Sequence, residues 1–118
     1  MTRRILIADD EPNIVVSLEF LMKREGFEVA TAVDGEATLA AIEKTRPDLV
    51  LLDIMLPKMN GFEVCQRIRS NPQWSGIKVL MLTAKGRDTE VAKGLALGAD
   101  AYVTKPFSTK DLVAQVRQ

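Results

Sequence analysis

LVLLD, at residues Leu49–Asp53, combines four consecutive apolar residues with a terminal carboxylate. An apolar run without alternation is typical of a strand that is buried on both faces of a parallel sheet. The run ILIA at Ile5–Ala8 shows the same pattern and leads directly into the acidic residues of the segment 9–11. These two runs predict a sheet whose central strands end in chemically active residues.

Three further runs extend the pattern outward from this centre: VATA at Val29–Ala32, VLML at Val79–Leu82 and AYVT at Ala101–Thr104. Between the runs, apolar residues recur at helical spacing. Gly26 follows the first such segment at the position of a helix C-cap. Five strands that alternate with helices predict an α/β fold with a parallel sheet and, through right-handed crossovers, helices on both faces. The clearest helical positions are Ile14, Val15, Leu18, Leu21 and Met22, then Val64, Cys65 and Ile68, and then Leu112, Val113 and Val116.

The composition of the chain excludes several classes of function. The 118 residues are enough for one domain, and 16 basic residues balance 16 acidic ones, so this stretch is not expected to bind nucleic acid directly. One cysteine excludes an internal disulfide, and the lack of histidine excludes histidine-ligated metals and Ser-His-Asp catalysis. The chain contains no signal peptide pattern and no apolar stretch of roughly 20 residues, so we expect a cytoplasmic protein that does not enter the membrane.

Polar residues follow four of the five predicted strands. Ligands of open parallel sheets bind outside the carboxyl ends of the strands, so these residues are expected to converge. Three carboxylates at one edge repel one another unless a cation lies between them, and oxygen ligands without Cys or His favour Mg²⁺. A lysine and a hydroxyl complete an anion site that suits phosphoryl transfer. The converging residues are Asp9, Asp10, Asp53, Thr83 and Lys105.

At this point the sequence resembles the response regulator receiver domains of two-component signalling, over essentially its whole length. The resemblance implies the doubly wound strand order 2-1-3-4-5 and a single receiver domain at residues 1–118. Each motif is weak by itself, but all five occur in order, each at the end of its element. The matching stretches are Ile7–Glu11, Leu51–Gly61, Leu82–Ala84, Gly98–Tyr102 and Thr104–Phe107.

The resemblance implies a role for each residue at the strand ends. Asp53 matches the phosphoacceptor, which takes a phosphoryl group from a histidine kinase or a phosphotransfer protein. Asp10 matches the direct Mg²⁺ ligand, Asp9 its water-mediated helper, and the backbone carbonyl of Met55 a further ligand. Two alternatives from the residues themselves stay open: Asp53 as the cap of the next helix, and Asp10 as a helix N-cap before Pro12.

The resemblance also implies a conformational switch. Thr83 matches the hydroxyl that moves toward the phosphoryl group, Lys105 the lysine that pairs with the acids, and Tyr102 an exposed aromatic that turns inward. A cis peptide bond before Pro106 belongs to the same pattern. Met55 and Lys85 match the positions that tune the phosphoryl lifetime in this family. The surface expected to change covers the segments 88–97, 101–104 and 109–117.

Two forms of the switch, which differ in their output, fit the sequence. The chain fits either a stand-alone receiver or the N-terminal part of a longer regulator with an output domain. Lys93 and Asp111 fit the charge pairs through which the DNA-binding branch of the family dimerises on activation, but Ala101 and Gln115 do not.

Three other classes compete with the switch. An aspartyl-phosphate hydrolase would carry a second acid two residues after its nucleophile, where this chain has Met55. A nucleotide or flavin binder would need a glycine-rich loop after the first strand, where Asp9, Asp10 and Glu11 stand instead. A phosphorylation-independent binding module is the third. The switch is expected to act through self-phosphorylation and self-dephosphorylation, not through turnover of a free substrate.

Overall fold

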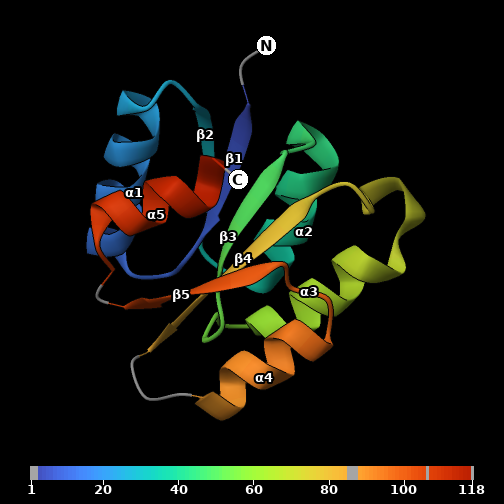
Figure 1. The fold of residues 1–118 in the computed structure, drawn as a ribbon. Helices are drawn as coiled ribbons and strands as arrows, with labels where there is room; N and C mark the ends of the chain where they lie inside the picture. Colours follow the sequence, from blue (N-terminus) through green and yellow to red (C-terminus); the bar gives the residue numbers. More distant parts are fainter. Residues whose placement is uncertain (1–2, 85–87, 106, 118) are drawn as a thin grey trace.

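A five-stranded parallel sheet forms the centre of the computed structural model, which describes residues 3–84, 88–105 and 107–117. The strands stand in the order β2-β1-β3-β4-β5 (Figure 1), which confirms the predicted α/β class and strand order. The chain therefore begins inside the sheet, moves to one edge and then crosses to the other. The strands are β1 (Arg4–Ala8), β2 (Glu28–Ala32), β3 (Leu49–Asp53), β4 (Lys78–Ala84) and β5 (Ala101–Lys105).

Burial follows the position of each strand in the sheet. All five residues of β3 are buried, as are the last four of β1, which confirms that these unalternating runs are covered on both faces. The edge strand β2 is mostly exposed or half-buried. The strands also extend past their apolar runs, because Asp53, Thr83 and Lys105 still belong to the ladder. These three side chains are therefore held by strands and not by loops.

Helices cover both faces of the sheet. α1 (Pro12–Arg24) and α5 (Thr109–Arg117) lie together on one face (Figure 1). α2 (Gly35–Thr45) and α3 (Gly61–Ser70) lie on the other, where α4 (Asp88–Ala96) packs beside α3 and β4, and a 3₁₀ turn, η1 (Pro72–Trp74), follows α3. Within the described residues, no helix has the length and apolar character that crossing a bilayer requires.

Each face of the sheet has its own hydrophobic core. The α1 and α5 side buries Leu18, Met22 and Leu112 against one set of strand residues. The α2 and α3 side buries Ile42 and Ile68 against the other set. The helical periodicity predicted for α1, α3 and α5 is thus confirmed, and the two cores fix the sheet between the helices.

The end of α1 shows how the local sequence sets the path of the chain. Gly26 has φ 94°, a conformation that residues with a Cβ atom rarely adopt. The N–H groups of Gly26 and Phe27 donate to the carbonyls of Lys23 and Met22 at 3.0 and 3.1 Å. This is a Schellman motif, and it confirms the predicted helix end at Gly26.

Candidate functional site at the carboxyl ends of the strands

The strand register places Asp9 and Asp53 next to each other. β1 and β3 pair in parallel with Ala8 opposite Leu52, so the residues that follow each of these stand at the same level of the sheet. Asp9 is fully buried and Asp53 is 6% exposed, whereas Asp10 is exposed at the rim. The convergence expected at this edge of the sheet is therefore present.

One carboxylate oxygen from each of Asp9, Asp10 and Asp53 lies within 4.8 Å of the others. Three carboxylates at this separation form an oxygen-only donor set, which suits a hard divalent cation. Mg²⁺ is held in proteins by one or two carboxylates with water or phosphate oxygens completing an octahedron, so this donor set fits it. The acidic cluster can therefore bind a metal.

Lys105 supplies the positive charge of the site. Its Nζ atom donates to Asp9 Oδ2 at 3.0 Å and lies 3.5 Å from Asp53 Oδ1. Burial opposes the charge on Lys105, but the hydrogen bond to Asp9 and the negative charges of Asp53, Asp9 and Glu11 outweigh it and raise the pKa of the ammonium group. Lys105 therefore stays protonated and holds the two buried carboxylates together.

The carboxyl group of Asp53 ionises less readily than that of an ordinary aspartate. Burial, and next the negative charge of Asp9, raise the pKa of Asp53 above its ordinary value. Lys105 and the N–H group of Met55, which donates to Asp53 Oδ1 at 3.3 Å, work in the opposite direction. Both contacts involve Oδ1, and no hydrogen bond or ion pair from the described residues reaches Oδ2. As far as the described residues are concerned, Oδ2 of Asp53 is thus available to a ligand or a reaction partner.

An open cleft of about 340 Å³ leads to these groups. Asp10, Asp53, Met55, Thr83 and Lys105 all line it, so the cleft joins the residues that the sequence singled out. Thr83 is 3% exposed, and its hydroxyl group donates to the carbonyl of Ala84 at 3.4 Å, which is long for a hydroxyl hydrogen bond. That hydroxyl can exchange this weak contact for a stronger acceptor in the cleft.

The two helix-cap alternatives are wrong. The N-cap of α3 is Asn60, whose Oδ1 accepts the N–H of Glu63 at 3.0 Å, so Asp53 caps no helix there. The N-cap of α1 is Glu11, one residue after Asp10, with Pro12 in the first turn as predicted. The N–H of Glu11 donates instead to Asp9 Oδ1 at 2.9 Å, which also helps to fix the buried carboxylate.

Known proteins resemble this chain in sequence and in fold. The model of the response regulator receiver domain matches residues 5–117. The chain belongs to the response regulator receiver family. It is 49% identical to the DNA-binding response regulator MtrA of Mycolicibacterium smegmatis and 46% identical to the alkaline phosphatase synthesis transcriptional regulatory protein PhoP of Bacillus subtilis. Both alignments cover 99% of this chain but 50% and 48% of those proteins, so the chain spans about half the length of these relatives.

Solved receiver structures have the same fold. A putative response regulator from Chloroflexus aurantiacus superposes with a TM-score of 0.96 at 35% identity, with 99% of this chain and 96% of that chain covered. The family match assigns this receiver to the signalling switches. It does not support the hydrolase or the nucleotide binder. Of the two regulators named above, MtrA is called DNA-binding, and half of its length lies outside the alignment.

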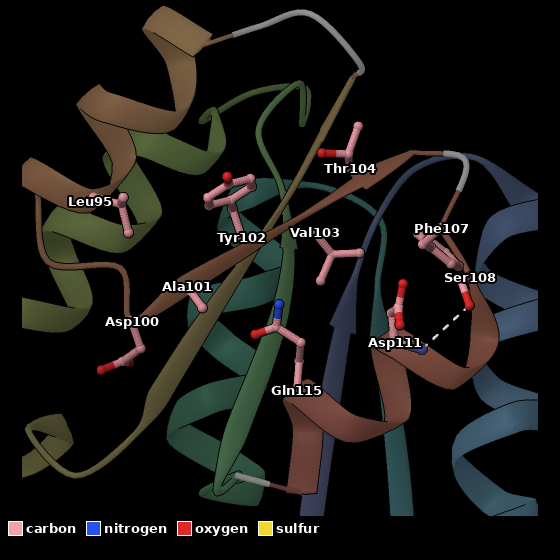
Figure 2. A pocket seen from close by; sticks show the side chains of 10 residues that line it. All are labelled: Leu95, Asp100, Ala101, Tyr102, Val103, Thr104, Phe107, Ser108, Asp111 and Gln115. Carbon is pink, nitrogen blue, oxygen red and sulfur yellow. Dashed lines mark hydrogen bonds between the residues drawn. The ribbon is translucent and has the colours of Figure 1, made fainter.

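A second concave surface of the receiver lies over β5, between α4 and α5. It is an open groove of about 670 Å³, larger than the acidic cleft. Figure 2 shows Tyr102 on the side of the groove nearer Leu95, with Phe107 and Asp111 on the opposite side. Tyr102 is 41% exposed, the position expected of it at rest. The cis bond expected before Pro106 and the residue Lys85 lie outside the described residues.

The sequence interpretation missed Arg69, which connects α3 to the segments before β4 and β5. Arg69 on α3 donates to the carbonyls of Gly98 and Ile77, both at 2.7 Å, and to Asp100 Oδ2 at 2.6 Å. These three hydrogen bonds tie the start of β5 to α3. No local pattern in the sequence indicates them, because they join residues that lie 8 to 31 positions apart in the chain.

Proposed function

We propose that Asp53 accepts a phosphoryl group from a phosphohistidine of a partner histidine kinase or phosphotransfer protein. The observation that supports this proposal is the convergence of Asp53 with Asp9, Asp10 and Lys105 at one edge of the sheet of a receiver domain. In this step an oxygen of Asp53 attacks phosphorus, a new P–O bond forms and the P–N bond of the donor breaks. The electron pair of that bond leaves with the imidazole, and Asp53 becomes an acyl phosphate.

The proposed Mg²⁺ ligands are Asp9, Asp10, Asp53 and the backbone carbonyl of Met55. The ion would neutralise the negative charge that builds up on the phosphoryl oxygens during transfer. The attacking oxygen is proposed to be Oδ2 of Asp53, because the contacts of this carboxylate with the described residues, those to Lys105 and to the Met55 N–H, both use Oδ1. Asp9 is proposed to act through water, since its Oδ2 already accepts from Lys105.

Thr83 and Lys105 are proposed to receive the phosphoryl oxygens. Lys105 Nζ lies 3.5 Å from Asp53, so it can turn toward a phosphoryl group on that residue while it keeps its bond to Asp9. Thr83 is proposed to donate its hydroxyl to a phosphoryl oxygen, and Tyr102 to turn inward into the space that Thr83 leaves. β4, which carries Thr83, pairs with β5, which carries Tyr102, and Thr83 stands opposite Thr104. A movement of one strand therefore displaces the other.

The output is proposed to be a downstream domain or protein that binds the groove around Tyr102. The named relatives are about twice as long as this chain, and one is called DNA-binding, which supports the proposal that residues 1–118 are the N-terminal part of a longer cytoplasmic regulator. A dimer formed on activation is part of the same proposal.

The test is the intact mass of the chain after incubation with acetyl phosphate. We expect a gain of one phosphoryl group with Mg²⁺, little gain with a chelator, and none in Asp53→Asn. Asp111→Asn, which removes an acid of the same type outside the cleft, is the matched control and should gain the group normally. No gain by the unmodified chain in any condition would leave the phosphorylation-independent binding module in place of this function.

A further inference from the structure

The loop 54–60 follows Asp53 and carries Met55. A hydrogen bond joins its two ends. The N–H of Gly61 donates to the carbonyl of Ile54 at 2.9 Å. A Cβ atom on Gly61 would lie 2.5 Å from the carbonyl oxygen of Asp53, so only glycine allows this close return of the chain. The loop 54–60 thus leaves Asp53 and comes back to it.

The middle of the loop is strained. The carbonyl of Pro57 accepts the N–H of Met59 at 2.7 Å, and the residue between them, Lys58, has φ 67°. A three-residue turn with positive φ at a non-glycine residue is rare and unfavourable. Such a turn persists where its surroundings hold it, and here the second hydrogen bond to Pro57 comes from the N–H of Gly35 at 3.1 Å.

Gly35 is buried against the far side of this turn. A Cβ atom at this position would overlap the carbonyl oxygen and the Cβ of Met59 and would stand 2.8 Å from the Met59 carbonyl carbon. Two of these three atoms belong to the backbone, so a side chain at residue 35 cannot be accommodated by a rotamer change. The loop would have to move.

The support under Gly35 is rigid. Gly35 is the first residue of α2, and Asp34 caps that helix by accepting the N–H of Ala37 at 2.7 Å. The hydroxyl of the fully buried Thr38 donates to the carbonyl of Asp34 at 2.7 Å, and Ile42 anchors the helix in the core. When the loop and α2 compete for space, we expect the strained loop to yield.

We propose that Gly35 is a positioning residue for the metal site, holding the loop 54–60 so that the backbone of Met55 stays beside Asp53. The proposal rests on the proposed function, because it takes the Met55 carbonyl as a Mg²⁺ ligand. It gives a role to the segment that follows the edge strand β2, where the sequence showed no chemically active residue.

The first test compares Mg²⁺ dissociation constants of Gly35→Ala and Gly76→Ala by titration calorimetry. Among the described residues, no heavy atom lies within 4 Å of a Cβ built on Gly76, so that variant makes the same chemical change in open space. We expect Gly35→Ala to weaken Mg²⁺ binding about tenfold, as loss of an outer support of a metal site typically does. Gly76→Ala should bind as the unmodified chain does. Circular dichroism without Mg²⁺ shows whether both variants are folded.

The second test needs no variant and so holds even if Gly35→Ala does not fold. Binding and loop order are linked reciprocally, so saturating Mg²⁺ should slow amide hydrogen exchange at Gly35 and Met59 by about fivefold or more. The amide of Arg46, which donates to Ile42 at the other end of α2, is the internal reference and should change little.

Each outcome points to one conclusion. If the unmodified chain binds no Mg²⁺, the proposed metal site itself is wrong. If it binds Mg²⁺ and a folded Gly35→Ala binds equally tightly, the metal site stands and the role of Gly35 is wrong. Exchange at Gly35 that is unchanged by Mg²⁺, while Met55 becomes protected, would also overturn that role.

Discussion

Asp53 is harder to ionise in the folded chain than in the unfolded one, because burial and the charge of Asp9 raise its pKa. The folded state therefore binds a proton more tightly. Its stability falls as pH rises from the ordinary value of 3.8 through the raised folded pKa. At neutral pH and without metal, this carboxylate destabilises the fold.

The first prediction concerns this carboxylate. Asp53→Asn should raise the free energy of unfolding at pH 7 without Mg²⁺ by on the order of 1 kcal/mol, because the neutral amide avoids the repulsion. The gain should shrink as pH falls toward 3.8 and also when Mg²⁺ is added. Urea unfolding at several pH values measures it, with the exposed Glu43→Gln as control. A variant that is less stable than the unmodified chain at pH 7 would contradict the electrostatic account.

The second prediction concerns Lys105. Lys105→Met leaves the fully buried Asp9 without its cation and should cost about 3 kcal/mol of unfolding free energy at pH 7. Mg²⁺ should recover part of the loss, since it supplies the missing positive charge. Lys23→Met, which removes an exposed ion pair with Glu19 at 3.1 Å, should cost less than about 1 kcal/mol. Equal losses in the two variants would show that Asp9 does not depend on Lys105.

At the scale of elements, Arg69 connects α3 to the starts of both β4 and β5. Its guanidinium donates to Ile77 before β4 and to Gly98 and Asp100 before β5. Asp100 in turn accepts the N–H of Val79 at 2.8 Å. The side chain of Arg69 therefore satisfies three acceptors at the end of the sheet opposite the site, and one of them, the Asp100 carboxylate, also binds the start of β4.

The third prediction follows from this network. Arg69→Met should lower the free energy of unfolding by about 2 kcal/mol, because carbonyls that are partly buried lose their donors. Arg67→Met, an exposed position on the same helix, should change it by less than about 0.5 kcal/mol. Denaturant unfolding of both variants checks the difference. A loss in Arg69→Met no greater than in the control would mean that solvent replaces these bonds without cost.

The elements also show what the sequence could and could not predict. Unalternating runs such as LVLLD predict buried strands, because only a strand covered on both faces needs apolar residues at every position. The convergence of Asp9, Asp53, Thr83 and Lys105 follows from the strand order, because the carboxyl ends of neighbouring parallel strands meet at one edge of the sheet. The support by Gly35 and Arg69 could not be predicted, because it depends on how close a loop and a helix approach in space, and no local pattern records that distance.

At the scale of the whole molecule, the acidic cleft and the groove around Tyr102 are separate surfaces of one sheet. The cleft lies at the ends of β1, β3 and β4, and the groove lies over β5 (Figure 2). The pairing of β4 with β5 is the direct link between them. In the proposed switch, the change at Asp53 reaches the groove through Thr83 and the pairing of β4 with β5.

The fourth prediction tests this link. Tyr102 is the sole tyrosine of the chain, so fluorotyrosine labels one site. Phosphorylation should shift its fluorine resonance as the ring leaves its exposed position, and the shift should be absent in phosphorylated Thr83→Ala. The fluorine spectrum before and after acetyl phosphate measures both. The same shift in Thr83→Ala would separate Tyr102 from the switch hydroxyl.

The central claim is that Asp53 becomes an acyl phosphate, and chemical trapping tests it most directly. Borohydride reduces an aspartyl phosphate to homoserine, which peptide mass mapping locates in the chain. After treatment with acetyl phosphate and Mg²⁺, the account predicts homoserine at position 53, with Asp9 and Asp10 unchanged. Homoserine at residue 9 or 10, or none at any position of a chain that has gained a phosphoryl group, would contradict it.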